Sequence, residues 1–273
     1  MAAWLSLPER AVLRLLGPEA LDFLDKLATQ DLSALKPGGC AYAALLSPQG
    51  KILSDFFVWR AGDEELLLDA PAARAEALLA RLRLMKLRAK LEIAPAQGWR
   101  AAAAVEEAPL EFAAPDPRLP ALGWRGVTQA PLAAAEPSAL RASRIALGVP
   151  DLAEDCGPEE IFALEGLLEE LHGVSFKKGC FPGQENVSRM KRRATTRKKF
   201  CPLRTAGEAP LGAPVLAGAV ELGVVRAAIP GTALALLRLD RALEAGPLSI
   251  AGREAVLQPP AWLILPATGS AED

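Results

Sequence analysis

The sequence predicts an α+β protein whose C-terminal part is a small all-β barrel or sandwich. In the first hundred residues, runs with strand character alternate with two runs of helical spacing. Beyond Leu203, short apolar segments alternate with Gly and Pro, which is typical of a barrel or sandwich. With 273 residues, the chain is also too long for one compact core, so two or three subdomains are expected.

The N-terminal elements follow from apolar spacing and from turn residues. Gly17-Pro18 begins an expected helix, because proline suits the first position of a helix. Ser47-Pro48-Gln49-Gly50 joins two strands, and Pro71 opens a long helix that runs to about Met85. The strands expected in this part cover residues 11–16, 41–46, 52–59, 65–69, 87–93 and 99–105.

The middle of the chain is less regular in pattern. Residues 108–137 are rich in Pro and Ala, which predicts irregular crossing segments. Pro158 begins another expected helix, which ends before Gly173. The apolar face of that helix consists of Ile161, Leu164, Leu168 and Leu171. The C-terminal strands are expected at residues 213–217, 222–229, 233–239, 248–250 and 255–257.

Composition narrows the class of protein. The formal net charge is -2, so no global field favours binding to nucleic acid or to a membrane. No stretch approaches the roughly 20 apolar residues of a membrane span. The first ten residues lack a basic segment followed by an apolar run, so no secretory signal is visible. A cytoplasmic protein without a membrane partner is the expectation.

The cysteines point to one place in the chain. Cys40, Cys156, Cys180 and Cys201 are widely separated, and His172 is the single histidine. These residues give neither a metal site of the usual spacing nor a disulfide framework, so no metal is expected. By default each cysteine is a small buried apolar residue. Only the surroundings of Cys180 argue for another role.

Cys180 lies in the run Lys177-Lys178-Gly179-Cys180-Phe181-Pro182-Gly183-Gln184-Glu185. The two lysines, and a helix expected to begin after Pro182-Gly183, favour a thiolate, so Cys180 is a candidate catalytic residue. Gly179 and Gly183 allow positive φ and close approach of a ligand. Gln184 and Glu185 offer an amide and a carboxylate to a flat heterocycle. The alternative is a loop with a buried cysteine and solvated lysines.

A cationic run follows the Cys180 segment. Seven basic residues occur within residues 189–199, namely Arg189, Lys191, Arg192, Arg193, Arg197, Lys198 and Lys199. The run is interpreted as a solvated face, as a site for RNA phosphates or as a site for a polycarboxylate tail. Phe200 is its only aromatic neighbour, so a polyanionic ligand fits better than RNA, and RNA contact is not expected.

Residues 178–185 resemble the KGCxxGQE signature of YgfZ-like folate-binding proteins, which are relatives of the glycine-cleavage T-protein, an aminomethyltransferase. Further segments agree with this resemblance. They are Leu15-Leu16-Gly17-Pro18, Thr29-Gln30-Asp31, Leu46-Ser47-Pro48-Gln49-Gly50-Lys51 and the stretch from Arg144 to Pro150, which is similar to R-x-x-x-G-x-P. The likeness covers most of the chain and is loosest at residues 100–138 and in the C-terminal part.

The resemblance implies two interleaved ferredoxin-like subdomains around a central folate cavity, plus a C-terminal β-barrel. The folate-binding region would span residues 1–197, and the barrel residues 198–273. Within the region, residues 1–45 with 138–197 would form one subdomain and residues 46–137 the other.

The resemblance also implies a ligand, a site and partners. Tetrahydrofolate or a one-carbon derivative would be the cofactor, and Cys180 would face it. The implied folate-binding residues are Lys178, Gly179, Cys180, Gln184, Glu185 and, on charge, Arg189. The expected partners are a reduced folate and iron–sulfur enzymes or assembly proteins.

The chain departs from the family pattern at three places. Phe181-Pro182 stands where many relatives have Tyr-Thr, and Ala194 stands where the family has Gly. Ala146 stands where aminomethyltransferases carry a Glu that can pair with the pterin, and Glu165 is a candidate replacement. The last departure argues against true aminomethyl transfer.

Three functions compete at this point. The first is a tetrahydrofolate-binding accessory factor that supports iron–sulfur cluster assembly or repair, with an indirect link to tRNA modification. The second is a folate-dependent aminomethyl or one-carbon transferase. The third is RNA binding through residues 189–199. The Cys180 signature favours the first, and because clusters usually take four ligands, one thiol would have to share any cluster with a partner.

Overall fold

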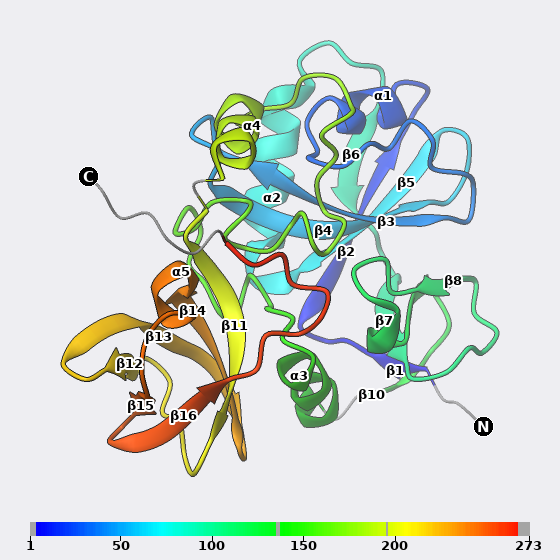
Figure 1. Cartoon of the computed structure of the whole chain (residues 1–273). Helices are drawn as coiled ribbons and strands as arrows, with labels where there is room; N and C mark the ends of the chain where they lie inside the picture. Colours follow the sequence, from blue (N-terminus) through cyan, green and yellow to red (C-terminus); the bar gives the residue numbers. More distant parts are fainter. Residues whose placement is uncertain (1–3, 135–136, 195, 267–273) are drawn as a thin grey trace.

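The first sheet is built from residues 10–95 and has the strand order β3-β4-β5-β2-β6 (Figure 1). Its strands are β2 (Arg10–Leu16), β3 (Cys40–Leu46), β4 (Ile52–Arg60), β5 (Glu65–Pro71) and β6 (Glu92–Pro95). Both faces of this sheet are covered, so β4 and β5 are buried along most of their length instead of alternating between buried and exposed residues. The computed structural model describes residues 4–134, 137–194 and 196–266.

Two helices cover one face of this sheet. Helix α1 (Ala20–Asp25) contributes Leu24 and helix α2 (Ala72–Lys86) contributes Leu78 and Leu82 to a core shared with Leu15 and Phe56 of the strands. The opposite face presents Val12, Trp59 and Leu67 to the second sheet. This sheet is therefore the central layer of the N-terminal part.

The second sheet has the order β10-β1-β7-β9-β8. Its strands are β1 (Leu5–Ser6), β7 (Arg100–Ala104), β8 (Phe112–Pro115), β9 (Trp124–Thr128) and β10 (Ala133–Ala134), and the short helix η1 (Pro120–Leu122) precedes β9. Ala101 and Val127 of this sheet pack against Trp59 of the first. The two sheets thus share one apolar contact layer.

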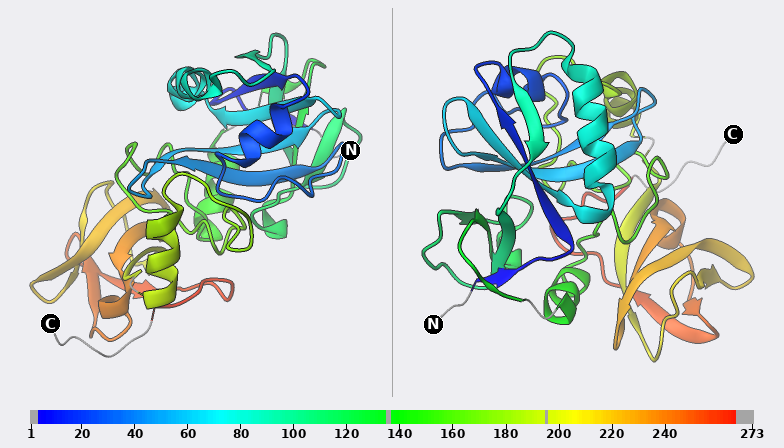
Figure 2. Two further views of the ribbon diagram at one scale, coloured as in Figure 1. Left: turned by 90° about the horizontal axis from the view of Figure 1, so that it is seen from above. Right: turned by 180° about the vertical axis from the view of Figure 1, so that it is seen from behind.

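The C-terminal strands close into a barrel with the order β11-β14-β13-β12-β15-β16. They are β11 (Lys198–Thr205), β12 (Pro214–Ala217), β13 (Val220–Ile229), β14 (Thr232–Arg238), β15 (Leu248–Ile250) and β16 (Arg253–Leu257), and α5 (Leu239–Ala242) follows β14. The views in Figure 2 place this barrel to one side of the sheets, with α3 (Pro137–Ala146) between the barrel and the second sheet. The α+β fold with a C-terminal barrel is confirmed.

Three sequence expectations differ from the structure. Residues 158–171 form successive turns instead of a helix, and Leu167 and His172 have positive φ, which interrupts helical geometry. Their apolar side chains are nevertheless buried, because the segment packs between β4 and the barrel. The stretch 108–137 contains β8, β9 and β10, and the strand expected at 87–93 begins only at Glu92, after Leu87 with φ 48°.

The expected subdomain boundaries also differ in part from the sheets. The border at residues 45 and 46 falls inside β3, which pairs with β4 from Cys40 to Leu46. The two sheets instead separate between β6 and β7. The barrel begins at Lys198, and α4 (Gln184–Arg193) precedes it.

Asp69 on β5 joins the two sheets through charge. Its carboxylate accepts a hydrogen bond from Arg10 Nε of β2 at 2.6 Å and from Arg125 of β9 at 2.7 Å. All three side chains are at most 9% exposed. Burial by itself raises the pKa of Asp69, but the two guanidinium groups outweigh it and bring this pKa below the usual 3.8.

We therefore expect Asp69→Ala to lower the free energy of unfolding by about 3–5 kcal/mol, because two buried guanidinium groups lose their counter-charge. Since the pKa of Asp69 is lowered in the fold, its stabilisation is complete at neutral pH and is lost as pH falls through that lowered value. Urea unfolding at neutral and acidic pH measures both effects.

Asp63→Ala is the matched control for this experiment. Asp63 pairs with Arg60 at 3.3 Å, but its side chain is 88% exposed. Its loss is expected to cost less than about 1 kcal/mol. Equal destabilisation by the two variants would contradict the role assigned to Asp69.

Candidate functional site

The candidate site richest in charged residues is a central cavity of about 580 Å³. It is bounded by the N-terminal end of β2, by β4, β9 and α3, and by the barrel turn at residues 228–230. Its charged lining consists of Glu9, Arg10, Asp55, Asp116, Arg118, Arg125, Arg141, Arg144, Asp151 and Glu154. The volume lies within the range of about 300–1,000 Å³ that small-molecule sites occupy.

Most of the arginines in this cavity are held by carboxylates. Arg118 pairs with Asp116 at 2.8 Å, and Arg125 lies 4.0 Å from the same carboxylate. The guanidinium groups of Arg118 and Arg125 also lie over the ring of Phe57, at 4.9 and 3.9 Å from its centroid. The arginines are therefore fixed in place before any ligand binds.

Arg144 and Arg141, both on α3, differ in how firmly they are held. Arg144 is buried and pairs with Asp155 and Glu154, each at 2.8 Å. The side chain of Arg141 is 43% exposed and lies 3.9 Å from Glu154. Arg141 is therefore the cavity arginine that can most readily turn towards an anionic ligand.

One carboxylate oxygen of Asp55, on β4, lacks a hydrogen-bond donor among the described residues. Its Oδ2 accepts from the hydroxyl of Tyr42 at 3.0 Å, whereas its buried Oδ1 has no protein donor among the described residues. Burial raises the pKa of Asp55, although the charge of Arg10 opposes this shift. A buried carboxyl group of this kind needs a donor from elsewhere, such as a ligand N–H.

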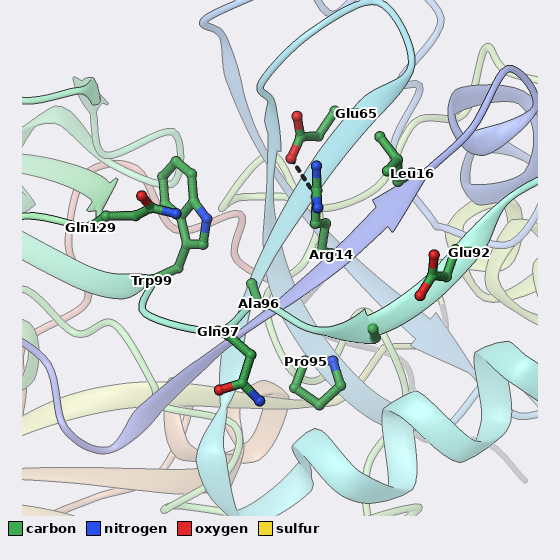
Figure 3. A pocket seen from close by; sticks show the side chains of 10 residues that line it. Arg14, Leu16, Glu65, Glu92, Pro95, Ala96, Gln97, Trp99 and Gln129 are labelled. Carbon is green, nitrogen blue, oxygen red and sulfur yellow. Dashed lines mark hydrogen bonds and ion pairs between the residues drawn. The ribbon is translucent and has the colours of Figure 1, made fainter.

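A second pocket, of about 410 Å³, lies between β2, β5, β6 and the loop that carries Trp99 (Figure 3). The side chains of Arg14 and Glu65 meet within it at 2.6 Å. Both are partly exposed and satisfy each other. Unlike the central cavity, this pocket is lined, among the described residues, by no buried polar side-chain atom that lacks a partner.

The Cys180 segment lies outside both pockets. Cys180 and Gly179 are exposed, and none of the six residues expected to bind folate lines the central cavity. Gln184 donates from Nε2 to the carbonyl of Gly179 at 3.3 Å, and Glu185 is exposed at the start of α4. Arg189 donates to Asn186 Oδ1 at 2.6 Å. The segment and the cavity are thus two separate places on the protein, and the folate-binding role of these six residues stays a prediction.

The other cysteines differ from Cys180 in exposure. Cys156 and Cys201 are buried, which raises the pKa of each thiol to about 12. Burial also raises the pKa of Cys40 well above its usual value. Cys180 is the exposed thiol of the four.

Lys178 is held in place by several hydrogen bonds. Its ammonium group donates to the carbonyl oxygens of Ala28 and Gln30, both at 2.9 Å, and to that of Asp25, and it pairs with the Asp25 carboxylate at 3.3 Å. The side chain is only 2% exposed, and burial lowers its pKa. Lys178 thus anchors the segment to the loop after α1.

Gly183 is a glycine of the Cys180 segment whose position requires the absence of a side chain. It precedes α4 with φ 81°, and a Cβ there would lie 2.6 Å from the carbonyl oxygen of Ser47. The turn at residues 47–50 therefore packs directly on the start of α4, where Asn186 donates to the carbonyl of Gln49 at 2.8 Å. Gly179 does not use positive φ, contrary to what its sequence context suggests.

The basic residues of the cationic run lie in different environments in the fold. Lys191 pairs with Glu169, and Lys199 is buried with Glu170 at 2.5 Å. Ala194 ends α4 with φ 49°, so the glycine position of the family pattern does adopt positive φ. Glu165 accepts a hydrogen bond from the backbone of Phe162 and does not line the cavity.

Sequence reasoning missed the cavity residues. Asp55 and Asp69 interrupt the otherwise mostly apolar strands β4 and β5, and such an interruption is a signal of buried charge that could have been followed. Arg118 and Arg125 lie in the Pro-rich stretch that gave no clear pattern. Only folding brings them beside Asp55 and Asp69.

The fold and the cavity define a protein with the architecture of the glycine-cleavage T-protein. The aminomethyltransferase T of the glycine cleavage system from Bartonella henselae superposes with a TM-score of 0.74 over 98% of this chain and 88% of that chain, at 14% identity, which shows the fold alone. Residues 10–105 match the GCVT N-terminal domain, and residues 197–264 match the CAF17 C-terminal beta-barrel domain.

The chain belongs to the IBA57 family of iron–sulfur cluster assembly factors. It is 30% identical to mitochondrial IBA57 of Mus musculus over 91% of this chain and 80% of that protein, and 29% identical to that of Homo sapiens over 93% and 82%. The homologue from Mycosarcoma maydis is 30% identical over 72% of this chain, and the match covers 55% of that relative.

These comparisons correct one expectation. All three of these relatives are named as mitochondrial proteins, so the expectation of a cytoplasmic protein, made from the absence of a visible signal, is wrong. The resemblance to the T-protein is confirmed at the level of fold, and the narrower likeness to YgfZ-like proteins stays a prediction. Among the described residues, no helix is long and apolar enough to cross a membrane.

The anchoring role of Lys178 gives a testable expectation. Lys178→Ala should lower the free energy of unfolding by about 2 kcal/mol, because several buried carbonyl oxygens lose their donor. Lys177→Ala, at the exposed neighbouring position, should change it by less than about 0.5 kcal/mol. Chemical denaturation of the two variants measures both changes, and an unchanged free energy of unfolding for Lys178→Ala would refute the anchoring role.

Proposed function

We propose that this protein is an iron–sulfur cluster assembly factor that binds a reduced folate in the central cavity and meets its protein partner at Cys180. The observation that carries the folate part is the buried Asp55 oxygen without a protein donor in a cavity of about 580 Å³. The observation that carries the partner part is the exposure of Cys180. The relatives named as iron–sulfur cluster assembly factors supply the biological setting.

The cavity residues fit a folate chemically. A pterin presents N–H donors that Asp55 Oδ1 can accept, and the carboxylates of a glutamate tail suit an arginine that is free to turn, such as Arg141. Trp124 also lines the cavity and offers an aromatic surface. When bound, tetrahydrofolate would supply a carrier for one-carbon units.

The surface position of Cys180 supports a role towards another protein. A single exposed cysteine sulfur can contribute one ligand to a cluster whose other ligands come from a partner, since clusters usually take four ligands. Such contact requires an accessible sulfur, and the other three cysteines are buried or half-buried. Folate in the cavity and cluster contact at the surface would then be separate events.

A one-carbon transferase is the second candidate function. The specific observation in its favour is Asp55, a carboxyl group in the cavity whose pKa burial raises, so that it can exchange a proton nearer neutral pH. Turnover of formaldehyde or of an aminomethyl donor with tetrahydrofolate would establish it. An absence of turnover, with folate still bound, would leave the accessory factor.

Folate binding is tested by quenching of tryptophan fluorescence on titration with 5-formyltetrahydrofolate, a stable reduced folate. Saturable binding in the micromolar range is expected for the unmodified protein. Asp55→Asn should weaken it about tenfold or more, because a hydrogen bond to a charged acceptor is lost. The matched control Asp63→Asn removes an exposed carboxylate and should leave the affinity unchanged.

The same titration separates the two possible folate sites. If Glu185→Gln weakened binding and Asp55→Asn did not, the folate would lie at the Cys180 segment as the sequence suggests. No binding to the folded unmodified protein would remove folate from the proposal.

Cys180→Ser tests the partner role. In cells that lack the protein, this variant should fail to restore the activity of a cluster-dependent enzyme while it binds 5-formyltetrahydrofolate with unchanged affinity. Cys40→Ser, at a half-buried thiol, is the control and should restore that activity. Full restoration by Cys180→Ser would contradict a chemical role for the exposed sulfur.

A further inference from the structure

Helix α2 is apolar on two faces. Ala75, Leu78 and Leu82 are buried against the first sheet. A second apolar row is exposed, at alternating separations of four and three residues, and consists of Ala73, Ala77, Ala80, Leu84 and, just past the helix end, Leu87. Leu84 is 73% exposed and Leu87 is 86% exposed. A helix at a protein surface normally directs polar residues to solvent, so this outer row calls for an explanation.

Basic residues surround the two exposed leucines. The segment 81–90 contains five of them and no acidic residue, namely Arg81, Arg83, Lys86, Arg88 and Lys90. Within the part of the chain that the structure describes, none of the five forms an ion pair with a carboxylate. Leu84 and Leu87 together with these five residues are named the α2 patch. Its positive charge contrasts with the net charge of -2 for the whole chain.

The shape and the charge of the α2 patch indicate what can cover it. Neither pocket described above is lined by α2, so the patch is the outer side of a helix and not a groove for a side chain. A second copy of the same patch would meet it with like charge. An amphipathic surface that combines protruding leucines with unpaired cations matches an anionic lipid interface, where leucines enter the headgroup region and cations meet phosphates.

We propose that the α2 patch binds the protein peripherally to an anionic lipid bilayer. Leu84 and Leu87 enter the interface, and Arg81, Lys86 and Arg88 contact lipid headgroups. This attachment needs no membrane span, and it is independent of the folate and Cys180 roles proposed above.

The cationic helix α4 provides a contrast inside the same chain. It carries Arg189, Arg192 and Arg193, but its buried Val187 faces the interior and no large apolar side chain of α4 is strongly exposed. In Figure 1, α2 lies behind the first sheet and α4 in front of it, and the view from above in Figure 2 separates them in the same way. A bilayer on α2 would thus leave the side of α4 facing solvent.

Sedimentation with vesicles tests this proposal. The 273-residue chain should co-sediment at low ionic strength with vesicles of phosphatidylcholine that contain about one third phosphatidylserine. Binding should be far weaker to vesicles of phosphatidylcholine alone. Leu84→Ser with Leu87→Ser should reduce the partition coefficient at least about tenfold. Arg81→Glu with Arg88→Glu should reduce it at least about twentyfold, at roughly fivefold for each lost cation.

A charge reversal on α4 is the control for the vesicle experiment. Arg189→Glu with Arg192→Glu makes the same change of charge on α4 and should leave vesicle binding nearly unchanged. Because all the substituted side chains are exposed, unchanged melting temperatures are expected and must be measured. No binding to the anionic vesicles would overturn the proposal, as would equal losses from the α2 and α4 charge variants. Binding to polyglutamate without binding to vesicles would assign the patch to an acidic protein instead.

Discussion

The buried carboxylate of Asp69 is the interaction on which the arrangement of the two sheets depends. It is fully buried, and it holds Arg10 from its own sheet and Arg125 from the other. Removing three charged groups from water is costly, and only mutual pairing at 2.6 and 2.7 Å compensates for that cost. The same pairing fixes two of the arginines that line the central cavity. The contact that joins the sheets therefore also shapes the candidate ligand site.

Beyond this contact, two buried atoms of the cavity residues lack a hydrogen-bond partner among the described residues, Asp55 Oδ1 and Arg125 Nε. Arg118, Arg125 and Arg144 are paired with carboxylates, whereas Asp55 retains an oxygen without a donor. Natural proteins seldom leave such a group unsatisfied in the interior, and where they do, the site often has a function. This argument places the proposed folate contact on Asp55, at a distance in sequence from the Cys180 segment that first suggested a folate.

The Cys180 segment has a different organisation from the cavity. The ammonium group of Lys178 donates hydrogen bonds to carbonyl oxygens in the loop after α1. Gly183, which has no Cβ, allows the start of α4 to approach the turn at residues 47–50. These two contacts hold the loop in place while Cys180 itself stays exposed. A thiol on an anchored loop at the surface suits contact with another protein. The Cys180 segment thus contains residues with an anchoring role beside one residue with a candidate chemical role.

The sequence by itself determined the α+β class, most of the strands, helix α2 and the position of the barrel, because these depend on local apolar spacing and on turn residues. It also singled out Cys180, since the chemistry of that segment is contiguous in the chain. It could not determine that residues 158–171 fold as turns, because their burial between β4 and the barrel overrides local helical spacing. Only the tertiary structure decided the candidate ligand site, since Asp55, Arg118 and Arg141 come from distant segments that no local pattern connects. Short-range apolar periodicity in the sequence specified the helices and strands. The cavity, in contrast, forms only when folding pairs buried charged residues from distant segments.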